Sequence, residues 1–457
     1  MKTLVYTSAL GLICMLAEML NLRKWVLPIC VAGLAVILAL NFGTGWGVNQ
    51  GFYQNMILVD NYSVAFSGLL IMLGILILIL SGNFYKNEQS KLSDYLAILI
   101  FTLCGGIALV SFGNLVMFFL GLEVLSISLY ILAGSKRKDI RSNEAGMKYF
   151  LMGSFASGIL LFGIALIYGE TGTFDVYEIA RLKAQVMPGA MFYIGAGMIM
   201  MALFFKVSAA PFHFWAPDVY EGSPTLITLT MATLAKIAAF GAFYRLFSTC
   251  FLPAMQTYAW VFSAVTALTL AIGNFTALQQ DSFKRLLAFS GISHAGYLMM
   301  AILSVYGNSA NALFYYALAY GLTSVAAFAI AIVVASNAQS EKIDAFNGLG
   351  KTKPWLAGAL TLAMLSMAGI PPFAGFFGKY YVFTEAVKTG HVYITIFAVV
   401  NSIVAVYYYF KVVLAMYTKE PAEVAFTVKP SYTFVIGVCV LLILLIGIFP
   451  SAFASLL

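Results

Sequence analysis

Four ionisable side chains lie deep inside apolar stretches of the sequence, where a charge is costly. Seventeen almost wholly apolar residues lead into Lys206, and Lys236 lies within TLAKIAAF. Lys379 lies within GFFGKYYVF, and Glu123 lies within GLEVLSISLYILAG. Burial weakens the proton affinity of a lysine and a nearby carboxylate strengthens it, so a Lys–Glu pair of variable separation can take up and release protons. These residue types therefore predict proton transfer, with Glu123 and Lys206 as a pair if their segments touch. Lys236 would be the next acceptor and Lys379 the last group.

Two of these lysines lie beside prolines. Pro211 follows Lys206 by five residues, and Pro371 and Pro372 precede Lys379 in GIPPFAGFFGKYYVF. Proline lacks an N–H and breaks a helix, and the freed carbonyls need a partner or water at membrane depth. The pattern predicts two broken helices that line a hydrated path. An alternative remains open, in which each lysine only satisfies a freed carbonyl.

One histidine belongs to the same set. His294 lies in FSGISHAGYLMM, and imidazole titrates near neutral pH, so it could relay protons between Lys236 and Lys379. A structural alternative is equally open: hydrogen bonds from Ser290, Ser293 or a helix carbonyl would satisfy the ring.

The composition defines the class of protein. The chain has 457 residues, of which 62% are hydrophobic and 9% charged, and its mean hydropathy is +0.94. So much apolar sequence predicts an all-α polytopic protein embedded in the lipid bilayer. The net charge of +7 comes without a long basic run, so we expect no nucleic-acid partner.

The sequence carries no sign of a cofactor or metal. Its five cysteines are scattered singly in apolar segments, without a CxxC pair, which predicts buried thiols instead of an iron–sulfur or zinc site. The three histidines are dispersed. We expect neither a metal nor a redox centre in this chain.

Spacing of the apolar stretches predicts about fourteen transmembrane helices, at roughly 20 residues per crossing. The predicted spans are about 3–21, 25–43, 61–81, 93–112, 114–134, 144–168, 189–209, 224–247, 256–280, 285–306, 310–337, 355–387, 391–417 and 430–450. All of residues 1–457 then form one membrane domain.

The loops predict the orientation. Of the 25 Lys and Arg residues, fifteen fall on one side and five on the other, so the basic side is predicted to be cytoplasmic and both termini to lie outside. Lys148 and Lys411 lie within snorkelling reach of the cytoplasmic side, where anchoring is the favoured role.

The two broken segments, spans seven and twelve, are five spans apart. Because five is odd, a repeated five-helix unit would cross the membrane in opposite directions, as in inverted-repeat transporters. The predicted parts are 1–90 (spans 1–3), 91–250 (repeat one, spans 4–8), 251–420 (repeat two, spans 9–13) and 421–457 (span 14).

Six motifs stand out together: LFFKVSAAPFHFWAPDVYEGSPT, GLEVLSISLYILAG, NEAGMKYFLMGSFASG, TLAKIAAF, RLLAFSGISHAGYLMM and GIPPFAGFFGKYYVF. They resemble the antiporter-like subunits of proton-pumping NADH:quinone oxidoreductase, respiratory complex I, over about residues 85–420. WAPDVYEGSP is similar to the N branch of this family in particular. Lys379 is similar to the N and L branches, whereas the M branch typically has Glu there.

The resemblance implies two inverted five-helix units with broken seventh and twelfth helices. It also implies that Glu123 and Lys206 act as a coupled pair, that Lys236 is the central proton carrier and that Lys379 lies nearest the exit. His294 matches a position along a hydrated axis.

The resemblance further implies a subunit of a translocase in a bacterial cytoplasmic membrane. Its partners would be other membrane subunits of complex I, the antiporter-like and quinone-site subunits. NADH, FMN, iron–sulfur clusters and quinone would belong to partner subunits. Two alternatives remain: a subunit of an Mrp-type cation/proton antiporter, which DVYEGSP disfavours, and a structural membrane subunit without transport.

Overall fold

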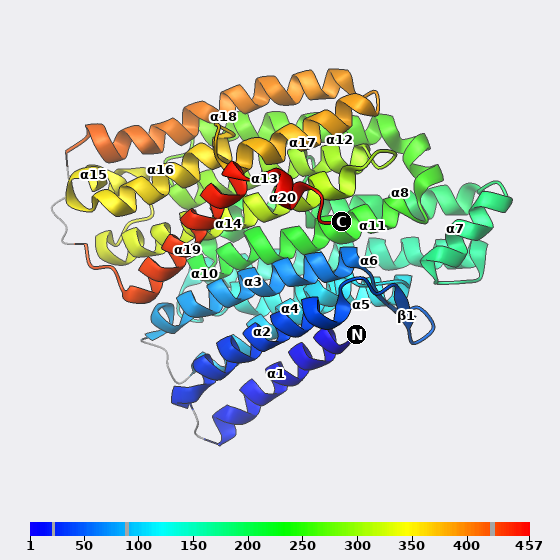
Figure 1. The fold of residues 1–457 in the computed structure, drawn as a ribbon, viewed down its shortest axis with the longest axis horizontal. Coiled ribbons are helices and arrows are strands. Elements are labelled where there is room, and N and C mark those ends of the chain that lie inside the picture. Colours follow the sequence, from blue (N-terminus) through cyan, green and yellow to red (C-terminus); the bar gives the residue numbers. More distant parts are fainter. Residues whose placement is uncertain (21–22, 87–90, 421–425) are drawn as a thin grey trace.

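The computed structural model describes residues 1–20, 23–86, 91–420 and 426–457. Nearly all of its regular structure is helical, and the long helices lie side by side with similar axes (Figure 1). The helix ends near Arg23 and Pro354 lie at the left of this view, and α7 (Val176–Gln185) lies at the right.

The N-terminal part comprises three helices and a small hairpin: α1 (Lys2–Met19), α2 (Arg23–Gly45), β1 (Gln50–Phe52), β2 (Ile57–Val59) and α3 (Asn61–Phe84). The two strands are antiparallel. The sequence did not predict this hairpin, because each strand has only three residues.

The next part contains the first broken helix. Its elements are α4 (Leu92–Val110), α5 (Leu115–Ala133), α6 (Ile140–Thr171), α7, α8 (Ala190–Lys206), α9 (Trp215–Gly222), α10 (Thr225–Thr230), the π-helix η2 (Met231–Ala235) and α11 (Lys236–Ser248).

The remaining part contains the second broken helix. Its elements are α12 (Leu252–Leu278), α13 (Phe283–Leu303), α14 (Ser309–Ala338), the 3₁₀ helix η3 (Ile343–Phe346), α15 (Leu349–Thr352), α16 (Pro354–Ala368), α17 (Ala374–Lys388), α18 (Val392–Thr418), α19 (Pro430–Ile448) and α20 (Ser451–Ala454).

In the described chain, eleven helices are long and apolar enough to cross a membrane, with Thr225–Ser248 taken as one helix. Three shorter apolar helices, Lys2–Ala17, Ala190–Lys206 and Pro354–Ala368, accompany them. The predicted all-α polytopic fold is confirmed, and each predicted span overlaps one helix, a pair of helices or, at 224–247, the three consecutive elements α10, η2 and α11. The count of fourteen crossings and the inverted repeats stay predictions.

Both proline segments do break a helix. Residues 207–214 separate α8 from α9, with Ser208 at a φ of +62°, and residues 369–373 separate α16 from α17, with Gly369 at a φ of +84°. The Ala210–Pro211 and Pro371–Pro372 peptide bonds are cis. The backbone N–H of Ala210 donates to Thr269 Oγ1 of α12 (2.9 Å), so α12 holds the first break in place.

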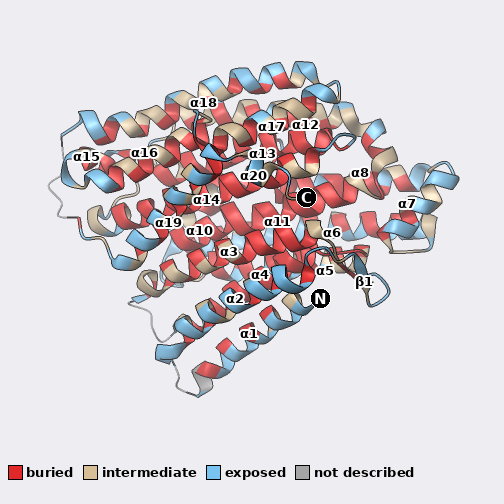
Figure 2. Ribbon diagram, in the orientation of Figure 1, coloured by how far each residue is buried: buried red, intermediate tan, exposed pale blue. Residues whose placement is uncertain are grey.

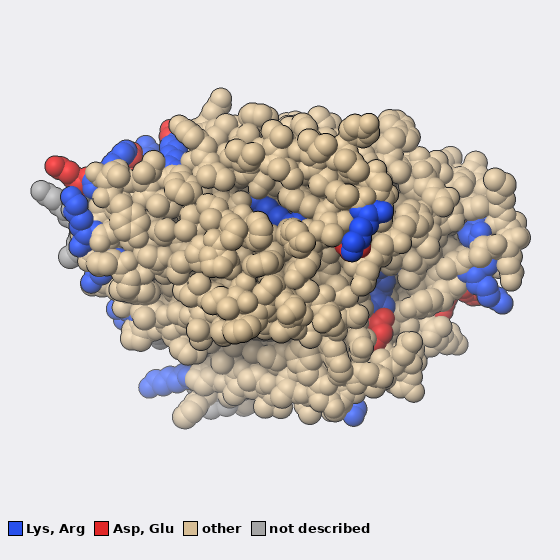
Figure 3. All heavy atoms as spheres, turned by 45° about the horizontal axis from the view of Figure 1, so that its top comes forward, with Lys and Arg blue, Asp and Glu red and all other residues tan. Residues whose placement is uncertain are grey.

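Burial divides the helices into an inner and an outer set. The span window is 100% buried in Thr225–Ser248, α13 and α14, but only 33% buried in α6 and in α18 (Figure 2). The helices that carry Lys236 and His294 are therefore enclosed by protein. Charged side chains are sparse on the outer face drawn in Figure 3, as expected for a surface against lipid or other apolar helices.

Close helix packing gives a test of the fold. A Cβ added to Gly105 of α4 would lie 2.8 Å from Leu125 Cα of α5, so Gly105→Ala is expected to cost about 1–3 kcal/mol by overpacking. The melting temperature of the assembled complex measures this. Gly158→Ala is the matched control, because a Cβ there meets nothing within 4 Å. An unchanged melting temperature for Gly105→Ala would contradict the α4–α5 contact.

Candidate functional site

Lys206 lies at the end of α8, where the backbone leaves the helix. Its Nζ donates to Ser126 Oγ of α5 (2.6 Å) and to Tyr149 OH of α6 (3.3 Å). The same Nζ lies 5.5 Å from the centroid of the Tyr149 ring. Lys206 is buried, and these contacts are all with neutral groups.

Glu123 approaches Lys206 through α5. It lies three residues before Ser126 and so on the same side of the helix, and its carboxylate accepts a hydrogen bond from Ser157 Oγ of α6. The Ser126 hydroxyl, which contacts Lys206, thus lies one helical turn from Glu123. The fifth and seventh spans therefore do touch, at Ser126 and Lys206. No ion pair joins Glu123 to Lys206 in the described chain, so their action as a pair stays a prediction.

Lys236 begins α11, directly after the π-helix Met231–Ala235. Its Nζ donates to the backbone carbonyl of Gly291 in α13 (2.6 Å) and lies 6.0 Å from the centroid of the Tyr320 ring of α14. π-helical turns occur frequently at functional sites. The sequence around Lys236 gave no sign of this one.

His294 is held between two tyrosines. Its Nδ1 lies 2.7 Å from Tyr316 OH of α14, and its Nε2 lies 3.1 Å from Tyr409 OH of α18. Tyr409 OH lies 2.5 Å from Ser290 Oγ in turn. The ring is therefore hydrogen-bonded as the structural alternative expected, but by two tyrosine hydroxyls and not directly by Ser290, Ser293 or a carbonyl. Sequence reasoning missed Tyr409, because its partner lies far away along the chain.

The helix α13 links the second and third buried lysines. Gly291, His294 and Tyr297 follow one another at intervals of three residues and so share one side of the helix. The Gly291 carbonyl accepts a hydrogen bond from Lys236 Nζ, and the centroid of the Tyr297 ring lies 4.7 Å from Lys379 Nζ. Tyr297 OH is buried and has no hydrogen-bond partner in the described chain. A buried polar group of this kind is a place for ordered water.

Lys379 lies in α17, and one of its partners lies at the end of α16, on the other side of the second helix break. Its Nζ donates to the Ala368 carbonyl and to Ser402 Oγ, both at 2.9 Å. Ala368 ends α16, so its carbonyl is one that the proline break frees. The alternative role, satisfying a freed carbonyl, therefore describes Lys379, whereas Lys206 and Lys236 have other partners.

The comparisons with known proteins bear on this arrangement. A family model described as the transmembrane part of NADH:quinone oxidoreductase and Mrp antiporter proteins matches residues 113–405. NADH-quinone oxidoreductase subunit N of Flavobacterium johnsoniae is 49% identical over 100% of both chains.

The chain belongs to the antiporter-like subunit family of NADH:quinone oxidoreductase and Mrp antiporters.

Solved structures agree with this family. A chain of respiratory complex I from Thermus thermophilus matches with a TM-score of 0.85 and 32% identity, over 99% of this chain and 98% of that chain. A chain of the Mrp complex from Dietzia sp. DQ12-45-1b has a TM-score of 0.88, covering 99% and 95%, but only 20% identity, so it shows the shared fold alone.

The two lysines expected to anchor the chain have partners that the sequence did not reveal. Lys148 pairs with Glu144 (2.7 Å) and with Asp218 of α9 (3.1 Å). Lys411 donates to Asp281 (3.3 Å) and to the Gln280 carbonyl (3.0 Å). Both lysines are partly exposed, at 42% and 36% of the side chain.

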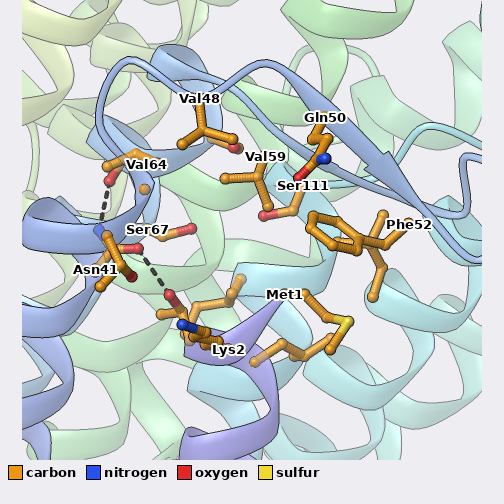
Figure 4. A pocket seen from close by; sticks show the side chains of 17 residues that line it. Met1, Lys2, Asn41, Val48, Gln50, Phe52, Val59, Val64, Ser67 and Ser111 are labelled. Atoms are coloured by element: carbon orange, nitrogen blue, oxygen red, sulfur yellow. Dashed lines mark hydrogen bonds between the residues drawn. The ribbon is translucent and has the colours of Figure 1, made fainter.

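The described residues contain no cluster of three or more His, Cys, Asp or Glu side chains suited to a metal ion. The five cysteines are buried thiols that form no disulfide, as predicted. A separate cavity of about 240 Å³ lies between α1, α2, α3 and the hairpin, lined in part by Met1, Lys2 and Asn41 (Figure 4). None of the buried lysines lines it.

Thermal stability should distinguish functional from structural lysines. Lys206→Met removes a buried charge whose partners are neutral, so the melting temperature of the complex is expected to stay level or rise. Lys284→Met is the contrasting variant, because Lys284 binds Glu341 and the carbonyls of Glu221 and Ser223. Leaving those groups unpaired should cost about 1–3 kcal/mol, because the Glu341 carboxylate is 40% exposed and keeps part of its solvation. Equal losses in both variants would contradict this division.

Proposed function

We propose that this chain is the N-type, proton-translocating membrane subunit of a bacterial NADH:quinone oxidoreductase. The observation that carries the proposal is the single side of α13 that runs from the Lys236 contact at Gly291, through His294, to Tyr297 beside Lys379. Full-length similarity to a relative named subunit N favours this family member.

In the proposed mechanism, Glu123 and Lys206 act as a switchable pair. In the structure Lys206 has neutral contacts only, and a direct approach of Glu123 would raise its proton affinity. The resulting change in charge alters the field at Lys236, and electrostatic effects are strong in an enclosed, low-dielectric interior. Lys236 then passes its proton to the groups that line one side of α13.

The second half of the path uses the groups along α13. A proton leaving Lys236 moves to His294, whose two ring nitrogens contact Tyr316 and Tyr409. Water beside the buried Tyr297 hydroxyl carries it on to Lys379, from which it leaves the membrane. Imidazole with a hydroxyl at each nitrogen can accept a proton on one side and give one up on the other.

The proposed setting follows from the family. Electrons flow elsewhere, with NADH, FMN, iron–sulfur clusters and quinone bound by partner subunits. Other membrane subunits of complex I lie beside this chain in the bacterial cytoplasmic membrane, and both termini face outward. An Mrp-type antiporter role is the second candidate; DVYEGSP and the low identity of the Mrp structure disfavour it. Identification of the proteins that co-purify in mild detergent separates the two.

Substitution of the buried ionisable groups tests the proposal. Lys206→Ala and Glu123→Ala should each reduce proton pumping and coupled quinone reduction by about tenfold or more, measured with the assembled complex in proteoliposomes. Lys236→Ala and Lys379→Met should abolish pumping. Lys411→Met is the control, because Lys411 lies at the surface with Asp281. Full pumping in assembled Lys236→Ala and Lys379→Met complexes would contradict the assignment.

A further inference from the structure

A group of charged side chains lies around α9, apart from the buried residues Lys206, Lys236 and Lys379. Asp218 Oδ2 lies 3.1 Å from Lys148 Nζ of α6, and Asp218 Oδ1 lies 3.2 Å from Arg285 Nη1 of α13. Arg285 also pairs with Glu221 of α9 (2.7 Å). Of the carboxylates in the described chain, only Asp218 pairs with basic groups on both α6 and α13. It therefore joins the parts predicted as repeat one and repeat two.

An aromatic contact beside this group leads to the first buried lysine. Tyr149 directly follows Lys148 in α6, and Trp215 lies three residues before Asp218 in α9. Their rings stack at 4.5 Å with an interplanar angle of 7°. Tyr149 also contacts Lys206 through its hydroxyl and its ring. Lys206 thus contacts Tyr149, one of the two rings through which α6 packs on α9.

The other side of the charged group leads to the second half of the path. Arg285 lies in the first turn of α13, the helix whose Gly291 carbonyl binds Lys236 and which carries His294. Because α13 is a continuous helix, a displacement of its first turn is transmitted to Gly291, six residues further on. The helix α9 packs against both α6 and α13.

We propose that Asp218 is a positioning residue that couples the protonation of Lys206 to the Lys236–His294 axis. This inference rests on the proposed proton-transport function. A protonated Lys206 holds the Tyr149 ring by a cation–π contact, which weakens when the lysine loses its proton. Tyr149 and Trp215 then shift together, and α9 carries Asp218 from one basic partner toward the other.

The exposure of the three charged groups suits such an exchange. The side chains of Lys148, Asp218 and Arg285 are 42%, 42% and 33% exposed. Ion pairs of this kind are individually weak, so a small displacement of α9 can redistribute Asp218 between them. A strong, fully buried pair would instead fix one arrangement.

A double-mutant cycle in the assembled complex tests the coupling. The measurement is the number of protons pumped per NADH oxidised in proteoliposomes. Asp218→Asn is expected to lower this ratio by about twofold or more, and Asp218→Glu should largely preserve it. Lys148→Gln and Arg285→Gln should each give a similar loss. Since each one breaks the same bridge, combining them should add no further loss.

Controls separate this inference from a structural role and from the proposed function. Glu178→Gln breaks another partly exposed ion pair, with Arg181, and should leave the ratio unchanged. A normal ratio in Asp218→Asn, or additive losses in the Lys148→Gln/Arg285→Gln complex, would show that Asp218 only fastens the helices. If the complex with Asp218→Asn fails to assemble, Lys148→Gln and Arg285→Gln, each alone and combined, provide the test. Loss of pumping in Lys206→Ala with a normal ratio in Asp218→Asn overturns the coupling alone, whereas normal pumping in Lys206→Ala overturns the proposed function.

Discussion

The proposed proton path depends on three lysines that are buried inside the helical bundle with neutral partners. Lys206 contacts two hydroxyls, Lys236 a backbone carbonyl, and Lys379 a carbonyl and a hydroxyl. No carboxylate pairs directly with any of them in the described chain, and the proposed mechanism requires each lysine to gain and lose a proton. Lys284, by contrast, pairs directly with the Glu341 carboxylate.

The two helix breaks serve different purposes. The break after Lys206 leaves a short helix, α9, that packs against α6 and α13 and brings their charged side chains together. The break between α16 and α17 exposes the Ala368 carbonyl, which Lys379 binds. The first proline break therefore leaves a short helix between α6 and α13, and the second frees a carbonyl that Lys379 binds.

The sequence predicted the features that follow from residue chemistry. Helices break at Pro211 and Pro371 as predicted, and the length of each apolar stretch predicted where the long helices lie. Both effects depend on local sequence. The partners of the lysines were beyond reach, since the Gly291 carbonyl is a backbone group with no signature in the sequence. The π-helix before Lys236 and the bond from Tyr409 to His294 depend on packing between distant segments, which no local pattern records.

The direction of α13 links the path to the membrane voltage. From Gly291 to Tyr297 the helix rises about 9 Å, roughly a third of the hydrocarbon thickness of about 30 Å. With the predicted orientation, a proton moving from Lys236 to Lys379 travels outward, against an inside-negative potential. Moving a proton over that distance would then cost about 0.8 kcal/mol per 100 mV, so this part of the proposed path would perform electrical work.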